Sequence, residues 1–212
     1  NIERFGGDEH QVTIAGQSAG GALVYAMLDA PQASGMFHRA IIQSFAPGSH
    51  SFATREQAEH DGAAFATALG ATDAAQMRAA TAADVLRVSS DMHLDLHVDG
   101  ATIREPFGAS LPLLNDVPIM MGITADEASW VPEDAARTRT RLAEYGADFA
   151  RLYPAEDDAA LRDAALLSDR HSTLVAMERW ATARSARNGA DLYLYLWTHT
   201  LPGPDAARYR AF

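Results

Sequence analysis

The sequence predicts an α/β fold, in which a mainly parallel sheet of about four strands has helices packed on it. Short apolar runs recur along the chain, and segments with apolar residues at helical spacing separate them. Strands that alternate with helices pair in parallel, and the helices then cover the sheet. With 212 residues, 48% of them hydrophobic, the chain is long enough for one domain with a substantial core. We therefore expect residues 1–212 to form a single domain.

The expected elements follow one another in alternation. The four apolar runs that predict strands are 12–16 (VTIAG), 39–45 (RAIIQSF), 117–123 (VPIMMGI) and 192–197 (LYLYLW). The segments that predict helices are 18–30, which Pro31 ends, 55–88, with breaks near Gly70 and Thr81, and a long region from about Pro132 to Gly189.

Composition excludes several classes of function. The formal net charge of -11, with only 17 Lys and Arg, argues against a nucleic-acid partner. The absence of Cys excludes disulfides, thiolate metal sites and a cysteine nucleophile. No apolar run approaches the ~20 residues that a membrane span needs. We expect a soluble protein, whose compartment (cytoplasmic, periplasmic or secreted) and oligomeric state the sequence leaves open.

The stretch VTIAGQSAGG places a serine between glycines directly after the first expected strand. Gly16, Ser18 and Gly20 match G-x-S-x-G, a pattern in which a strand turns sharply into a helix and exposes the serine oxygen. Ser18 is therefore a candidate nucleophile, and the N–H of Ala19, which opens the helix, is a candidate donor to an oxyanion. The small residues Gly16, Ala19, Gly20 and Gly21 should relieve crowding at this corner, and a bulky residue at position 20 should damage it. The alternative is a glycine-rich connection in which Ser18 only caps the helix.

Five segments, in this order and with these spacings, resemble the type B carboxylesterase and cholinesterase family of α/β-hydrolases. They are NIERFGGDEHQVTIAGQSAGG (1–21), GMFHRAIIQS (35–44), HVDGATIREP (97–106), VPIMMGITADEAS (117–129) and LYLYLW (192–197). The resemblance implies a partial α/β-hydrolase fold, the central to C-terminal part of the domain with both ends missing. It also implies a serine carboxylesterase that hydrolyses small-molecule esters through a Ser-His-Glu triad, without cofactor or metal.

The resemblance assigns roles to individual positions. Ser18 resembles the nucleophile, and Glu127 in TADEAS resembles the acid of the triad. Asp126 is the rival acid, although it matches a neighbour whose side chain points elsewhere. Ser44 resembles a serine that hydrogen-bonds the triad acid, and its alternative is a strand-end serine that caps backbone.

Two further positions concern the substrate. Gln17 stands where many relatives have Glu, and a neutral side chain there should reduce attraction for cationic alcohols, against a choline-ester specialist. Trp130 coincides with an aromatic position that lines the active-site gorge in relatives, where its indole could pack on an acyl or aryl group. Burial in the core is the alternative for Trp130.

Two parts of the family's site are not in the sequence. The glycine-rich oxyanion loop would precede residue 1, and the catalytic His would follow Phe212 within a few positions, so we expect residues 1–212 alone to have little turnover. His199, just past the last expected strand, is the alternative base. Other open alternatives are amidase or thioesterase chemistry on the same triad and a non-catalytic, cholinesterase-like binding or adhesion domain.

One polar stretch offers metal-ligand types at alternating positions. In DMHLDLHVDG these are Asp91, His93, Asp95, His97 and Asp99, which an extended chain would place on one face. The same stretch matches the family's structural V-D-G segment, and the proposed catalysis requires no metal. We therefore expect no metal site here.

Overall fold

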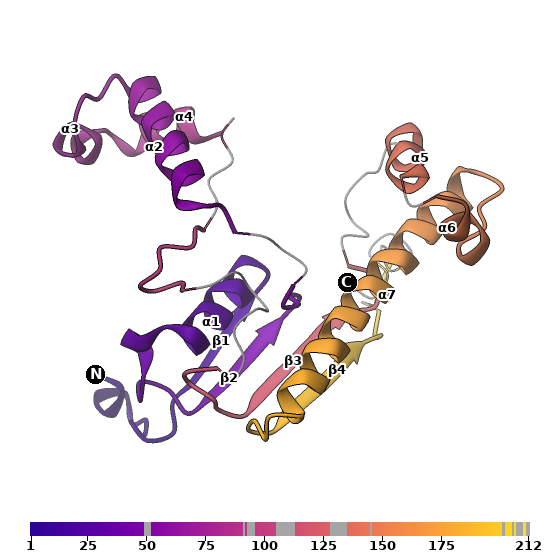
Figure 1. The fold of residues 1–212 in the computed structure, drawn as a ribbon, viewed down its shortest axis with the longest axis horizontal. Helices are drawn as coiled ribbons and strands as arrows, with labels where there is room; N and C mark the ends of the chain where they lie inside the picture. Colours follow the sequence, from indigo (N-terminus) through magenta and orange to yellow (C-terminus); the bar gives the residue numbers. More distant parts are fainter. Residues whose placement is uncertain are drawn as a thin grey trace.

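A four-stranded parallel sheet forms the centre of the molecule in the computed structural model (Figure 1). The structure describes residues 1–48, 52–90, 92, 96–104, 113–127, 135–144, 146–200, 202–204, 206 and 210. The strands, in sheet order, are β1 (Thr13–Gln17), β2 (Arg39–Gln43), β3 (Ile119–Thr124) and β4 (Leu192–Trp197). Every neighbouring pair is parallel, which confirms the predicted α/β class. Strand β2 ends two residues earlier than expected because Ser44 has a φ of 51°.

Helices connect the strands and form two groups beyond them (Figure 1). They are α1 (Ala19–Asp29), α2 (Arg55–Leu69), α3 (Ala74–Ala79), α4 (Ala82–Ser89), α5 (Ala135–Ala143), α6 (Gly146–Leu152) and α7 (Asp158–Ser185), with 3-10 turns η1 (Ile2–Phe5) and η2 (Pro31–Ala33). The predicted breaks are present: Gly70 ends α2 in the left-handed region, and Thr81 Oγ1 caps α4. Among the described helices, none has both the length and the hydropathy to cross a membrane.

Helices α1 and α7 cover one face of the sheet and build the main core with it. The sheet contributes its alternate, inward-facing side chains, which are Ala40, Ile42, Ile119, Met121 and Ile123. The helices contribute larger ones, which are Tyr25 and Leu28 from α1 and Met177 and Trp180 from α7. Burial of this apolar surface fixes the strands relative to the two helices.

The opposite face of the sheet is bare within the described residues. Met120 is 47% exposed, Tyr193 57% and Trp197 52%, although all three lie on strands. Parallel sheets are normally covered on both faces. A cover that the described residues do not supply is therefore expected on this face.

Gly122 in β3 allows a tyrosine to lie across this bare face. A Cβ on Gly122 would lie 2.4 Å from the ring of Tyr195 and equally close to the Tyr195 carbonyl oxygen. We expect Gly122→Ala to lower the free energy of unfolding by about 1–3 kcal/mol, because the backbone of β4 cannot yield without losing its pairing.

Urea denaturation of the complete protein measures this effect, with Gly62→Ala as the control. Gly62 lies inside α2, where no described atom is within 4 Å of an added Cβ. Alanine there should raise stability by about 0.5–1 kcal/mol. Equal effects of the two substitutions would contradict the role of Gly122.

Candidate active site

The corner between β1 and α1 exposes Ser18. The strand ends at Gln17 and the helix begins at Ala19, which leaves one residue for the turn. Ser18 has φ 54° and ψ -119°, a conformation that non-glycine residues rarely adopt. It is exposed and, although it occupies the N-cap position, its side chain makes no capping hydrogen bond. The side chain of Ser18 therefore does not cap α1, and the residue is open to solvent.

Two of the expected glycines, Gly16 and Gly21, make this corner possible. A Cβ on Gly16 would lie 2.1 Å from Gly20 O, and a Cβ on Gly21 would lie 3.1 Å from Gln43 O. At Gly20 itself no described atom lies within 4 Å of an added Cβ. Gly16 must therefore lack a side chain, because the backbone of Gly20 occupies the space that its Cβ would need. The effect of a bulky residue at position 20 stays a prediction.

Glu127 lies in the turn after β3, and two donors orient its carboxylate. Its Oε1 accepts hydrogen bonds from Ser44 Oγ at 2.7 Å and from the Thr124 N–H at 2.8 Å. Ser44 thus uses its hydroxyl on Glu127 and not on a backbone group. The side chain of Asp126 is instead paired with Arg170, at 2.9 Å. The structure therefore separates the two neighbouring carboxylates by their partners.

Backbone hydrogen bonds bring these residues to one edge of the sheet. The Ser18 N–H donates to Gln43 O at 2.9 Å, and the Ser44 N–H donates to Gly122 O at 2.8 Å. Ser18, Ser44 and Glu127 consequently follow three adjacent strands at their carboxyl ends. In open α/β sheets this edge is where ligands bind.

Two other predicted residues flank the serine. Ala19 is the first residue of α1, so its N–H is among the helix's first donors, which have no acceptor within the helix. Gln17, the last residue of β1, is exposed. Trp130 lies outside the described residues, and its predicted role stays a prediction.

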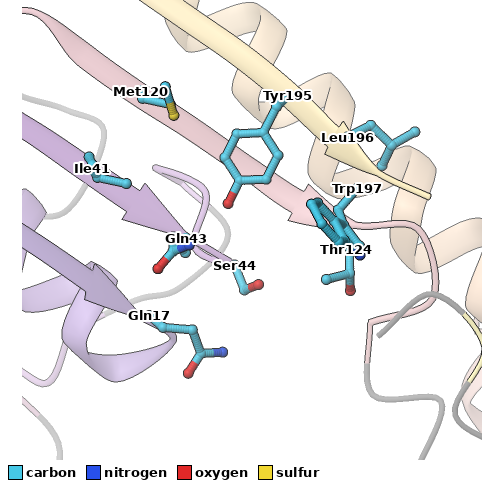
Figure 2. A pocket seen from close by; sticks show the side chains of 9 residues that line it. All are labelled: Gln17, Ile41, Gln43, Ser44, Met120, Thr124, Tyr195, Leu196 and Trp197. Atoms are coloured by element: carbon cyan, nitrogen blue, oxygen red, sulfur yellow. The ribbon is translucent and has the colours of Figure 1, made fainter. Parts of the chain in front are cut away.

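The hollow in Figure 2 lies over the bare face of the sheet, and its volume is about 760 Å³. It is lined by Gln17, Ile41, Gln43, Ser44, Met120, Thr124, Tyr195, Leu196 and Trp197. Neither Ser18 nor Glu127 is among these lining residues. The hollow therefore extends over the uncovered face of the sheet and reaches its carboxyl edge at Gln17, Ser44 and Thr124.

His199, the alternative base, makes its hydrogen bond away from Ser18 and Glu127. The carbonyl of His199 accepts a hydrogen bond from Trp197 Nε1 at 3.0 Å. Among the described residues, no hydrogen bond joins His199 to Ser18 or Glu127.

In the polar stretch 91–99, Asp91, His93 and Asp95 lie outside the described residues. Asp99 Oδ1 accepts the N–H groups of residues 101–103, and the Ala101 bond above all lowers the pKa of the Asp99 carboxyl. This carboxylate closes a turn, in agreement with a structural V-D-G segment.

Sequence reasoning missed two residues that contact this edge. Arg170 reaches the turn that contains Glu127 from the middle of α7, and nothing in the pattern of that helix indicates this contact. Tyr195 lies over Gly122, with its hydroxyl pointing toward Gln43 (Figure 2). The alternation LYLYLW places Tyr195 on the bare face. Only Gly122, the residue opposite it in β3, could have indicated in the sequence that its ring lies across the neighbouring strand.

Comparisons with known proteins give matches over most of the chain. The family model described as "Carboxylesterase family" matches residues 1–199. The para-nitrobenzyl esterase of Bacillus subtilis is 30% identical over 142 residues, which are 60% of this chain and 28% of that protein. A probable N-octanoylanthranilate hydrolase of Rhodococcus erythropolis is 49% identical over 70 residues, 33% of this chain and 15% of that protein.

A solved structure is similar over almost the whole chain. The carboxylesterase Est55 of Geobacillus stearothermophilus matches with a TM-score of 0.70 and 26% identity, over 96% of this chain and 47% of that one. The chain therefore spans about half the length of this solved relative.

The parallel sheet and the exposed serine at its carboxyl edge define an α/β-hydrolase fold. Within that class the chain belongs to the carboxylesterase family.

The Tyr195 phenol provides a pH-dependent signal near this edge. Burial raises the pKa of Tyr195 above its ordinary value of 10.0, and Glu127 acts in the same direction, while the hydrogen bond with Gln43 opposes them. The unfolded chain therefore loses this proton at lower pH than the folded protein. Tyr195 should contribute stability that is fully present below pH 10.0 and is lost as pH rises through the higher, folded pKa.

Tyrosinate absorbance and thermal unfolding of the complete protein test this expectation. Tyr195→Phe should remove from the tyrosinate absorbance a component that titrates above pH 10.0. The melting temperature of this variant should also decrease less as the pH is raised above 10.0. Tyr193→Phe, which removes an exposed phenol of the same strand, is the control. Removal of a component that titrates at or below pH 10.0 would contradict the assignment.

Proposed function

We propose that the protein is a serine esterase that hydrolyses carboxylic esters with Ser18 as its nucleophile. The observation that carries the proposal is the exposed residue Ser18, with φ 54°, at the sheet edge that also bears Glu127. Strained backbone of this kind concentrates at functional sites. Membership of the carboxylesterase family supports the same chemistry.

The mechanism assigns one step to each group. Ser18 Oγ attacks the ester carbonyl carbon while a histidine, which we expect to follow Phe212, accepts the hydroxyl proton. The carbonyl oxygen becomes an oxyanion, to which the Ala19 N–H donates. The histidine then gives its proton to the departing alcohol, and a water molecule, deprotonated in the same way, releases the acyl group from Ser18. Glu127 orients the imidazole and stabilises its charged form, and Ser44 orients Glu127.

Two observations bear on the substrate. One concerns the alcohol that leaves, and the other concerns the type of bond that is cleaved. Because Gln17 is exposed, uncharged and adjacent to Ser18, esters of neutral alcohols are favoured over choline esters. One relative is named as a hydrolase of N-octanoylanthranilate, an amide. Assays with a p-nitrophenyl acyl ester and with the corresponding N-acyl anthranilate therefore distinguish esterase from amidase activity.

Ser18→Ala should abolish hydrolysis of p-nitrophenyl esters by the complete protein. We expect kcat to fall by at least about 1000-fold, because loss of the nucleophile removes the acyl-enzyme route. Steady-state kinetics measure the loss, and Ser34→Ala, a change of an exposed serine beyond α1, is the control. Equal activity of the two variants would remove Ser18 from the mechanism, and an inactive parent protein would favour a binding or adhesion domain.

Glu127→Gln should lower kcat by about 100- to 10,000-fold with the melting temperature nearly unchanged, because the amide keeps the shape of the carboxylate but not its charge. Asp126→Asn should cost about tenfold or less. The same kinetics, run side by side, decide between the two acids. A larger loss in Asp126→Asn would reverse their roles.

A further inference from the structure

Arg170, in the middle of α7, reaches across to the turn that contains Glu127. Its Nη2 donates to Asp126 Oδ1 at 2.9 Å, and its Nε donates to the Ala125 carbonyl oxygen. Only 26% of the Arg170 side chain and 15% of the Asp126 side chain are exposed. The contact is therefore shielded from water, unlike an ordinary surface ion pair.

The guanidinium group holds two acceptors that belong to consecutive residues. Its N–H donors form a rigid planar fork, so a bond to a backbone carbonyl and a bond to the next side chain together fix the orientation of the peptide between them. That peptide joins Ala125 to Asp126, and Glu127 is the next residue along the chain. The helix that carries Arg170 is itself anchored, because Met177 and Trp180 are 1% and 5% exposed in the core.

The other contacts of this turn come from different elements. The Ala125 N–H donates to Trp197 O of β4 at 2.8 Å, and Glu127 Oε1 accepts from Ser44 Oγ and from the Thr124 N–H. Arg170 supplies the contact on the side of α7. Without Arg170, the Asp126 carboxylate would also lose this positively charged partner, while a second carboxylate, that of Glu127, follows it in the chain.

We propose that Arg170 is a positioning residue for the reaction: it fixes the 125–126 peptide through Ala125 and Asp126, and so holds the Glu127 carboxylate in the direction that the catalytic base requires. The inference rests on the proposed function, since it gives Glu127 a partner in a triad. Asp126 is then the anchor of Arg170 and not a rival acid.

The test compares variants of the complete protein with a p-nitrophenyl ester. Arg170→Met keeps the length of the side chain but removes its donors, and we expect kcat to fall about 10- to 100-fold with little change in KM. Arg170→Lys should recover part of the loss, because a lysine keeps the charge and N–H donors but not the rigid planar fork that fixes two acceptors together. Arg179→Met is the matched control, since Arg179 is exposed and lies further along α7, on the side of the helix opposite Arg170. Stoichiometric labelling of the serine by an organophosphate normalises kcat to folded sites.

The outcomes separate this inference from the proposed function. Ser18-dependent hydrolysis in the parent, with Arg170→Met equal to Arg179→Met, overturns the role of Arg170 alone. A parent without Ser18-dependent hydrolysis overturns both. If Arg170→Met does not fold, Arg170→Lys and Asp126→Asn decide: lower kcat at unchanged KM in both supports the role, and parental kcat in both rejects it.

Discussion

The first turn of α1 packs so closely against the end of β1 that only backbone atoms fit between them. A Cβ on Gly16 would lie 2.1 Å from Gly20 O, and one on Gly21 would lie 3.0 Å from Phe45 Cβ. This packing fixes the direction in which the chain leaves the strand, so the single connecting residue, Ser18, takes φ 54° and faces solvent. The exposure of the hydroxyl is thus a consequence of glycine packing on both sides of it.

The same edge of the sheet is built by a repeated backbone contact. At each step the residue that follows a strand donates its N–H to a carbonyl of the neighbouring strand. The three bonds run from Ser18 N to Gln43 O, from Ser44 N to Gly122 O and from Ala125 N to Trp197 O. The parallel register therefore determines which side chains can meet, and it places Ser44 beside Glu127 although 83 positions separate them in sequence.

Local patterns predicted the elements well, because apolar periodicity and helix breakers act within a few residues. The run 192–197 coincides with β4, and the break at Gly70 falls where the left-handed residue ends α2. The end of β2 was missed because it depends on the backbone of Ser44. The sequence pattern indicated the group of small residues at the corner, but the part that each glycine plays depends on contacts with backbone of the next turn. Arg170 could not be predicted, since its partners lie 44 and 45 positions away and no local pattern encodes such a contact.

Arginine provides three such long-range contacts with a common form. The chain contains no lysine, so all 17 of its basic residues are arginine. Each of three arginines binds a carboxylate together with a backbone carbonyl of the same or an adjacent residue: Arg104 at Asp29, Arg170 at Ala125 and Asp126, and Arg184 at Asp116 and Val117. A guanidinium group presents its donors in a rigid plane that matches two acceptors in a fixed relative position, whereas the donors of an ammonium group rotate. In a protein without disulfides, these forks join α1, the turn after β3 and the segment before β3 to distant parts of the chain, and the Arg170 fork acts next to the carboxylate that the proposed reaction needs.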